Sequence, residues 1–226
     1  MTHDFRDMMF CKDNFFVNPD KVVALLDEEL FFKSASYPGM RTNNLLESTN
    51  ERSRNFGLFV AKKICDEIFP GIHGLMIDVR FHINQVYNND TANEGWIHSD
   101  EADLAGLVYL SKNELSLHTG TSLFVKDTKG DFAVKDFTSR QEFNLTDVPS
   151  NEYIDDLKEN HKNFTETVRI GNLYNRLVAY DAKIFHRPNR YNLDSADTRK
   201  SIVFFIRGFK REFESKVNLK HNWEDA

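Results

Sequence analysis

The stretch Gly95-Trp96-Ile97-His98-Ser99-Asp100 is the part of this sequence that decides our interpretation of the fold. In an extended backbone, the side chains of residues i and i+2 point to the same side. His98 and Asp100 can therefore offer an imidazole and a carboxylate to a single metal ion. A third ligand is available from His186, which ends the predicted strand Lys183–His186 and follows Asp100 by 86 residues.

A His-x-Asp pair alone carries little weight, because eight histidines and 35 acidic residues among 226 positions produce about one such pair by chance. The surroundings change this assessment. The pair stands directly before a run of predicted strands, a histidine closes one of the later strands, and a basic segment opens the last one. Two histidines and one carboxylate on one face form the facial triad typical of non-haem Fe(II) oxygenases. We therefore predict that His98, Asp100 and His186 are the metal ligands and the catalytic centre.

Apolar and polar residues alternate from Leu75 to Val86, which predicts one long, half-buried strand. Further strands are predicted at Ala105–Leu110, Thr121–Val125, Leu173–Tyr180, Lys183–His186 and Arg199–Ile206. A polar insertion, residues 126–167, interrupts them and contains one predicted helix, Glu152–Asn160. A polar stretch of this length in a β-rich chain is more often a lid or substrate loop than core. We expect it to close over the substrate.

The N-terminal third has helical periodicity instead. Asn18 is a good N-cap residue and Pro19 suits the first turn of a helix, whose apolar positions continue to Leu30. A second helix is predicted from Glu51 to Phe69, where Pro70-Gly71 ends it. Its expected buried stripe consists of Phe56, Phe59, Val60, Ile64, Ile68 and Phe69.

These elements predict an α+β chain that is mainly β and forms a single domain, residues 1–226. Within it, residues 1–74 are expected to be a helical support and residues 75–209 the catalytic core, with residues 210–226 as a C-terminal tail. The length is sufficient for a core that needs no disulfide or structural metal.

Composition and charge exclude several classes of protein. With 40% hydrophobic and 28% charged residues, the chain is globular rather than disordered. Its formal net charge of −6 argues against a nucleic-acid-binding protein, which needs a basic surface. Apolar runs such as Ile202–Ile206 are far too short to span a membrane, and the charged N-terminus lacks the apolar segment of a secretory signal. With only Cys11 and Cys65, we expect free thiols and a cytoplasmic location.

The order of these motifs resembles the iron(II)- and 2-oxoglutarate-dependent dioxygenases, in particular their prolyl 4-hydroxylase-like branch. The resemblance covers residues 75–209 and rests on six pieces of sequence: Gln85-Val86-Tyr87-Asn88, His98-Ser99-Asp100, Tyr109-Leu110-Ser111, Thr119-Gly120-Thr121-Ser122-Leu123-Phe124, His186 and Arg199-Lys200-Ser201. The chain departs from the family pattern at three points. Thr119-Gly120 stands for a Gly-Gly pair, Ser111 stands for an Asn, and 13 residues separate His186 from Arg199 where nine or ten are usual.

The resemblance implies a double-stranded β-helix, or jelly-roll, with Fe(II) bound by the triad, 2-oxoglutarate as co-substrate and O₂ as oxidant. Arg199 is expected to bind the distal carboxylate of 2-oxoglutarate, because that group favours a planar, always charged partner. The long spacing leaves Arg190 and Lys200 as alternatives. Ser201 lies on the same strand face and can add a hydroxyl to that carboxylate, and Tyr109 matches a family position whose phenol also reaches it. Tyr87 matches a position that lines the co-substrate pocket.

The implied reaction is hydroxylation of an unactivated C–H bond, with release of succinate and CO₂. The substrate class stays open between a peptide or protein side chain and a small, amino-acid-like metabolite. Two other functions use the same residues. A His/His/Asp zinc hydrolase is possible on the triad alone, although it has no use for Arg199 or Tyr109. A β-helix binding module without activity is the second, although all three ligands and the basic anchor are intact.

Overall fold

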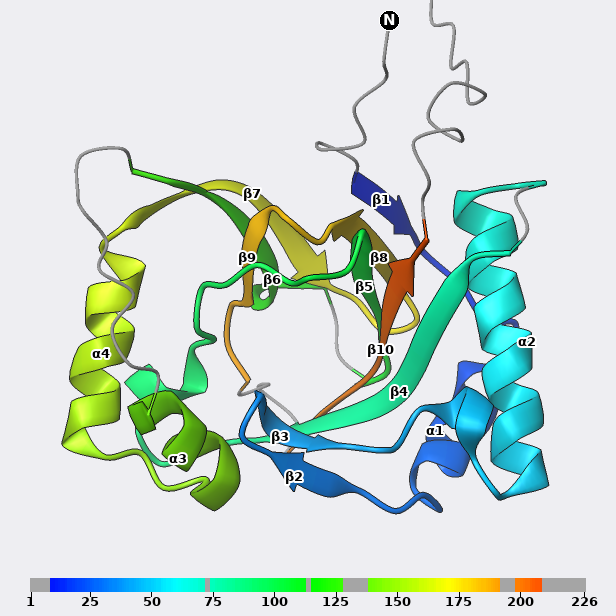
Figure 1. Cartoon of the computed structure of the whole chain (residues 1–226), viewed down its shortest axis with the longest axis horizontal. Coiled ribbons are helices and arrows are strands. Elements are labelled where there is room, and N and C mark those ends of the chain that lie inside the picture. The colour runs from blue at the N-terminus through cyan, green and yellow to red at the C-terminus, as the bar shows by residue number, and fades with distance from the viewer. Residues whose placement is uncertain (1–8, 72–73, 113–114, 128–137, 192–197, 209–226) are drawn as a thin grey trace, which may run out of the picture.

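Two antiparallel β-sheets carry the helices in the computed structural model, which describes residues 9–71, 74–112, 115–127, 138–191 and 198–208 (Figure 1). The described strands are β1 (Met9–Lys12), β2 (Phe32–Ser34), β3 (Tyr37–Arg41), β4 (Met76–Gln85), β5 (Leu104–Tyr109), β6 (Ser116–Lys126), β7 (Phe164–Asn172), β8 (Leu177–Asp181), β9 (Phe185–Pro188) and β10 (Thr198–Arg207). The described helices are α1 (Pro19–Leu26), α2 (Glu51–Ile68), α3 (Thr138–Thr146) and α4 (Asn151–His161), with the 3₁₀ turns η2 (Leu45–Glu47) and η3 (Thr91–Asn93).

The larger sheet has the strand order β1-β8-β5-β10-β4-β3-β2, and the smaller sheet has the order β7-β6-β9. Strands β4 and β10 pair along their whole length, from Met76 opposite Arg207 to Gln85 opposite Thr198. The prediction of a mainly β fold with helices is therefore confirmed, and the described strand pairs are antiparallel. The expected strand from Leu75 to Val86 is β4, shorter by one residue at each end.

The two faces of the larger sheet bury different neighbours. One face packs its apolar side chains, among them Phe81, Val108 and Phe204, against α1 and α2. The other face turns Leu107 and Tyr180, with their neighbours, toward the smaller sheet. In Figure 1, α1 and α2 lie on one side of the molecule, whereas α3 and α4 lie on the other. The space between the two sheets is where the candidate site lies.

Helix α1 begins as predicted, since the Asn18 side chain accepts a hydrogen bond from the Lys21 amide and Pro19 is the first helical residue. It ends earlier than the periodicity indicated. Leu26 is its last residue, and Leu30, expected on the buried stripe, is 77% exposed. The Asp27 amide donates to the Val23 carbonyl and closes the helix there.

Helix α2 confirms the predicted bounds within one residue, but its buried stripe is wrong at Phe59, which is 54% exposed. The buried positions are Ser53, Gly57, Val60, Ala61 and Ile64. A small residue is required at Gly57, because a Cβ there would lie 2.8 Å from the Cβ of Leu45 in η2. The helix therefore approaches η2 closely along a face of small side chains, which hydrophobicity alone does not indicate.

The N-terminal third contains strands that the sequence did not indicate. Strands β2 and β3 extend the larger sheet beyond β4, and β1 pairs with β8 at the opposite edge. Gly39 has a φ of +75°, and a Cβ there would lie 2.2 Å from the Ile83 carbonyl oxygen, so only glycine fits. The predicted helix Glu152–Asn160 is α4, whereas α3, within the 126–167 insertion, and β7, which begins in it, were not predicted.

The remaining expectations from the sequence concern the cysteines, membrane-spanning segments, the insertion and the C-terminal tail. Cys11 and Cys65 are both free thiols. No described helix combines the length and the apolar character needed to cross a membrane. The 210–226 tail and the centre of the insertion, residues 128–137, lie outside the described residues.

Candidate metal centre and active-site cavity

His98 and His186 are held opposite each other by the backbone. The His98 amide donates to the His186 carbonyl at 3.1 Å, and the His186 amide donates to the His98 carbonyl at 2.8 Å. This antiparallel bridge places the segment that contains His98 beside β9, although 88 residues separate the two histidines. The two imidazole rings lie with their centroids 4.6 Å apart. The sequence alone could predict the partners, but only the bridge fixes their spacing.

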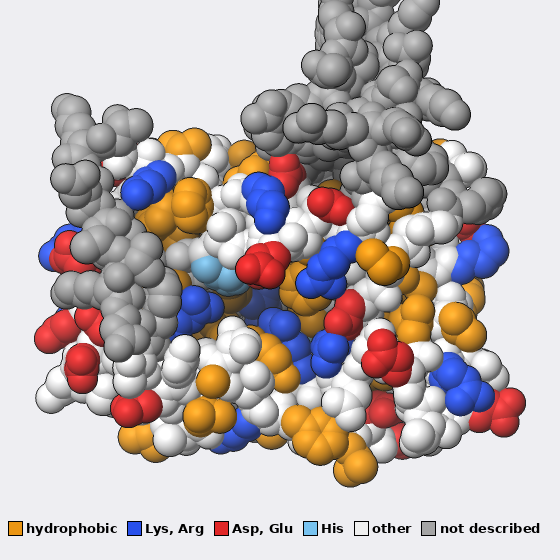
Figure 2. All heavy atoms as spheres, viewed as in Figure 1, with side chains coloured by type: hydrophobic (Ala, Val, Ile, Leu, Met, Phe, Trp, Pro, Cys, Tyr) orange, Lys and Arg blue, Asp and Glu red, His pale blue; other side chains and the backbone are white. Residues whose placement is uncertain are grey.

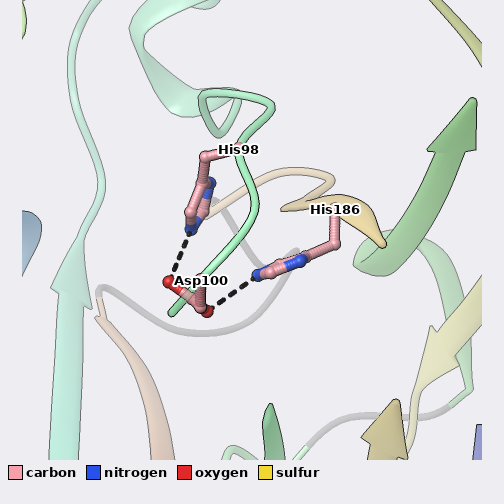
Figure 3. A group of neighbouring side chains, drawn as sticks. All are labelled: His98, Asp100 and His186. Atoms are coloured by element: carbon pink, nitrogen blue, oxygen red, sulfur yellow. Dashed lines mark ion pairs between the residues drawn. The ribbon is translucent and has the colours of Figure 1, made fainter. Parts of the chain in front are cut away.

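Asp100 completes the group, as Figure 3 shows. Its Oδ2 lies 3.2 Å from His186 Nε2, and its Oδ1 lies 3.9 Å from His98 Nε2. One ligand atom from each of the three residues lies within 4.8 Å of the other two. The structure thus brings the three predicted ligands together at one point.

The backbone also fixes the tautomer of both imidazoles. His98 Nδ1 lies 2.8 Å from the Trp96 carbonyl, and His186 Nδ1 lies 2.8 Å from the Ile184 carbonyl. A carbonyl oxygen can only accept, so each Nδ1 carries the proton and each neutral Nε2 offers a lone pair. Two imidazole lone pairs and a carboxylate then converge without a donor among them. Such a set of acceptors fits a cation, and it is the donor set that Fe(II) oxygenases use.

The ionisation of the group favours metal binding. Burial and the neighbouring His186 lower the pKa of His98 to about 3, so the imidazole stays neutral. Burial alone would raise the pKa of Asp100. The neighbouring His186, His98 and Arg41 outweigh that effect and hold this pKa at about 2. Protons therefore do not compete with a metal for His98 and Asp100 at neutral pH.

A cavity of about 240 Å³ opens at the triad and reaches across the inner face of the larger sheet. The face shown in Figure 2 is hollowed near its centre, and a histidine and several Lys or Arg side chains surround the hollow. The residues that line the cavity include the triad, three arginines (Arg41, Arg140 and Arg199), and the aromatic residues Tyr37, Trp96, Tyr153, Tyr180, Tyr191 and Phe205. Asp100 is the one carboxylate of this lining among the described residues.

Cross-strand pairing aligns a row of polar side chains on this inner face. Arg41 on β3 is opposite His82 on β4, His82 is opposite Ser201 on β10, and Ser201 is opposite Tyr109 on β5. Residues directly opposite each other in an antiparallel sheet lie on the same face. Arg199, two residues before Ser201, also shares this face. Arg199, Ser201, Val203 and Phe205 all line the cavity, which confirms the predicted common face of Arg199 and Ser201.

Of the three basic residues considered as anchors, Arg199 is the one that lines the cavity. It is 4% exposed, and its Nε has no hydrogen-bond partner among the described residues. The two alternatives lie elsewhere. The Lys200 ammonium forms an ion pair with Asp27, and the Arg190 side chain, 41% exposed, lies 3.8 Å from Glu94. Neither Lys200 nor Arg190 lines the cavity.

Tyr109 and Tyr87 lie behind the lining rather than in it. Tyr109 is fully buried, its ring lies 5.4 Å from the Arg199 guanidinium, and its hydroxyl hydrogen-bonds to Thr121, which does line the cavity. Burial raises the pKa of Tyr109, so its hydroxyl keeps its proton. The structure does not bring Tyr87 to the cavity. Its hydroxyl donates to Asp147 at 3.1 Å, and its ring packs on Phe143 of α3.

Several residues of the cavity were not predicted as site residues. Arg41 and Tyr37 belong to β3, and Arg140 and Asn144 belong to α3. Their contact with the site depends on β3 joining the sheet beside β4 and on α3 packing against β2 and β3. The stretch Tyr37-Pro38-Gly39-Met40-Arg41 offered one local signal, a Pro-Gly turn followed by an arginine, with nothing to indicate its neighbours.

The residues present also fit 2-oxoglutarate. The co-substrate has a carboxylate at each end, one beside a keto group that can chelate a metal. The triad supplies a metal position at one part of the cavity, and Arg199 supplies a buried cation with an unused Nε at another. A buried N–H without a hydrogen-bond partner, such as the Nε of Arg199, is costly, and an anion of this kind satisfies it.

Solved structures with a similar fold include a 2OG-Fe(II) oxygenase family protein and prolyl hydroxylases. The structure of HygX from Streptomyces hygroscopicus, with nickel and 2-oxoglutarate bound, matches 90% of this chain and 84% of its own, with a TM-score of 0.54 and 10% identity. A prolyl hydroxylase from Trichoplax adhaerens, in complex with a hypoxia inducible factor peptide fragment, matches 93% and 86%, with a TM-score of 0.53 and 12% identity. A 2OG-Fe(II) oxygenase family protein from Burkholderia pseudomallei matches 89% and 84%, with a TM-score of 0.50 and 10% identity.

At these identities the likeness establishes the fold of the chain. None of the curated proteins matches the sequence. A family profile does match, over residues 3–200, and its description is "Family of unknown function (DUF6445)". This match covers most of the chain, including the triad and the N-terminal strands, so the protein belongs to the DUF6445 family.

Proposed function

We propose that the protein is an Fe(II)- and 2-oxoglutarate-dependent oxygenase that hydroxylates an unactivated C–H bond and releases succinate and CO₂. One observation carries the proposal. A single cavity contains three converging metal-ligand atoms, from His98, Asp100 and His186, and a buried arginine, Arg199, whose Nε is unpaired. A zinc hydrolase would use the first feature and not the second.

Strand order supports a double-stranded β-helix as the core. Strands β4, β10, β5 and β8 are neighbours in the larger sheet, and β9, β6 and β7 are neighbours in the smaller one. The segment around His98 adds to the smaller sheet through its bridge to His186. Successive strands from β4 to β10, apart from β6 and β7, which are neighbours in the smaller sheet, thus alternate between two facing sheets, as in a jelly-roll.

In this proposal His98, Asp100 and His186 bind Fe(II), and Arg199 binds the distal carboxylate of 2-oxoglutarate. Bound Fe(II) with its co-substrate supplies the oxidation of the substrate by O₂. The protein contributes position and exclusion of water. Ser201 offers a hydroxyl on the strand face of Arg199, whereas Tyr109 positions Arg199 and Thr121 from behind. Trp96 and Tyr180 supply apolar wall beside the ligands.

The substrate in this proposal is a peptide side chain or a small, amino-acid-like metabolite. Both sizes occur among proteins of this fold, since the Trichoplax enzyme was solved with a peptide fragment and HygX with hygromycin B. Arg140, Asn144 and Tyr153 of α3 and α4 line the cavity, which supports a role for the 126–167 insertion in covering the substrate.

Anaerobic titration of metal-free protein with Fe(II) and then 2-oxoglutarate tests the proposal. We expect the weak visible charge-transfer band of chelated 2-oxoglutarate to appear in the wild type and to be absent in His98→Ala. Arg199→Ala should keep the band but require far more 2-oxoglutarate. Lys200→Ala is the matched control, because its side chain points away to Asp27. If the wild type gives no band and binds Zn²⁺ tightly, the oxygenase assignment fails.

A further inference from the structure

Arg41 places a second guanidinium in the cavity that the proposed reaction does not use. Its Cζ lies 4.0 Å from the centroid of the Tyr37 ring and 5.8 Å from that of Phe205. Its Nε is buried without a hydrogen-bond partner, and no ion pair of Arg41 occurs within the described part of the chain. Burial lowers the pKa of Arg41 to about 10, so the side chain is still a cation at neutral pH.

Arg140 places a third guanidinium there. Its Cζ lies 5.5 Å from the centroid of the Trp96 ring, and among the described residues it makes no ion pair. It reaches the cavity from α3, which packs against β2 and β3. The Asn144 side chain donates to the Ala35 carbonyl at 2.8 Å and fixes α3 beside the turn that leads into β3. Arg140 and Arg41 therefore belong to adjacent elements that border one cavity.

Neighbouring acidic groups do not neutralise these two arginines. The Asp78 carboxylate is held by both Arg80 Nε and Arg80 Nη2 at 2.8 Å, and Glu94 pairs with Arg187. His82, between Arg41 and Ser201, adds no charge. Burial lowers its pKa well below the usual value, and its Nε2 donates to the Pro38 carbonyl at 2.8 Å.

The formal charges of the loaded cavity show an excess. Fe(II) carries two positive charges and 2-oxoglutarate two negative ones, which offset each other. Asp100 offsets one of the three lining arginines. The two charges that remain are positive, and a desolvated positive charge without a partner is unfavourable. The substrate is the component still to be added.

We infer that Arg41 and Arg140 form an anion-binding subsite for the primary substrate, which is a small acid that carries a carboxylate or phosphate group. This inference rests on the proposed function and narrows its substrate class. A guanidinium presents paired N–H donors that match either anion. The cavity of about 240 Å³ is smaller than most small-molecule sites, so a compact acid fits it better than an uncharged peptide segment.

Fluorescence of Trp96 gives a direct test, because Arg140 lies over its ring. The chain has two tryptophans, so a Trp223→Phe background leaves Trp96 as the single reporter. This protein is loaded with Zn²⁺ and saturated with 2-oxoglutarate, whose binding is verified by calorimetry. It is then titrated with acetate, inorganic phosphate and, as a neutral control, acetamide, at constant ionic strength.

We expect a saturable response to acetate or to phosphate and none to acetamide. The better anion identifies which acid group the substrate carries. Arg41→Met and Arg140→Met should each raise the dissociation constant at least about tenfold, the loss expected for a charge-assisted hydrogen bond. Arg41→Lys keeps the charge without the planar fork and should fall between wild type and Arg41→Met. Arg169→Gln, on the outer surface of β7, should match the wild type.

A wild type without a saturable response to either anion overturns the inference, as does equal affinity in wild type, Arg41→Met and Arg140→Met. Failure of the proposed function is seen separately, as absence of 2-oxoglutarate binding in the calorimetric step. In that case the same titration without co-substrate still decides whether Arg41 and Arg140 bind an anion. If Arg41→Met does not fold, the anion dissociation constants of Arg41→Lys and Arg140→Met are compared with that of the wild type instead.

Discussion

The two faces of the larger sheet are built from the same strands but have different roles. One face forms the apolar core and the other lines the cavity. Toward α1 and α2, strand β10 presents Ile202, Phe204 and Ile206, which are fully buried in an apolar core. Toward the smaller sheet, the same strand presents Arg199 and Ser201 to the cavity. The alternation of a β-strand thus separates residues that hold the fold from residues that bind ligands, one position apart.

This arrangement means that stability and chemistry can be changed separately. The helix face carries a close-packed core that is largely apolar, so its loss is measured as free energy of unfolding. The cavity face carries cations and acceptors that are incompletely paired within the protein, so its loss is measured as ligand affinity. Substitutions on neighbouring residues test whether the two faces are as independent as the geometry indicates.

The largest effect is expected at the triad. His186→Ala removes one of three metal ligands, and we expect Fe(II) affinity to fall more than about 100-fold, since outer-shell changes alone cost roughly 10- to 100-fold. Competition with a chromophoric chelator measures the affinity. His118→Ala is the matched control, because this histidine lies on β6 outside the cavity lining. Retention of wild-type affinity in His186→Ala would remove it from the proposed ligand set.

The next effect compares two neighbours on β10 that face opposite ways. Phe204→Ala empties a fully buried site on the helix face and should cost about 3 to 5 kcal/mol of unfolding free energy. Phe205 lines the cavity and is only partly buried, so Phe205→Ala should cost less than half as much. Urea denaturation of both variants, followed by Fe(II) titration of the folded protein, measures the two effects. Equal losses of stability would contradict the separation of the faces.

The sequence predicted the cavity face well where its signals are local. His98 and Asp100 are two residues apart in an extended segment, and Arg199 and Ser201 are two residues apart on β10. Backbone geometry alone therefore puts the side chains of each pair on one side. The same alternation identified β4 within one residue at each end. A prediction of this kind requires only that the residue's own strand is assigned correctly, and it does not depend on which strands pair.

Prediction failed where position depends on distant pairing. Arg41 reaches the cavity because β3 adds to the sheet beside β4, with its register set by Arg41 opposite His82. A five-residue strand that contains Pro38 and Gly39 has little periodicity to indicate it. The prediction that Phe59 is buried failed for a related reason. Its helix approaches η2 along Gly57, and this small contact rotates the hydrophobic stripe away from Phe59.

Arg199 provides a smaller effect on the cavity face. Arg199→Ala should weaken 2-oxoglutarate binding by about 1.5 to 3 kcal/mol, the range for a hydrogen bond to a charged group. Arg199→Lys should recover part of this loss, because lysine keeps the charge and loses the paired donors. The dissociation constant comes from anaerobic titration of the charge-transfer band. The outcome against the assignment is unchanged affinity in Arg199→Ala together with a large loss in Arg190→Ala.

The smallest effect concerns Tyr87, which the sequence placed at the co-substrate pocket and the structure places against α3. Its hydroxyl donates to Asp147, which also forms an ion pair with Lys33, and its ring packs on Phe143 with a centroid distance of 4.9 Å. Tyr87→Phe keeps the ring and removes one hydrogen bond to a charged acceptor. We expect a loss of about 1 to 2 kcal/mol in unfolding free energy.

The co-substrate separates the two roles of Tyr87. If the hydroxyl only holds α3 in place, the dissociation constant for 2-oxoglutarate in Tyr87→Phe stays within about twofold of wild type, because this hydroxyl does not line the cavity. A loss of 2-oxoglutarate affinity with unchanged stability would instead assign Tyr87 to the pocket. Tyr153→Phe on α4 is the matched comparison. Tyr153 stacks on the same Phe143 ring at a centroid distance of 4.0 Å but, unlike Tyr87, lines the cavity. A substitution that changes only the unfolding free energy therefore marks a residue that supports the fold. A substitution that changes the affinity for 2-oxoglutarate marks a residue of the cavity face.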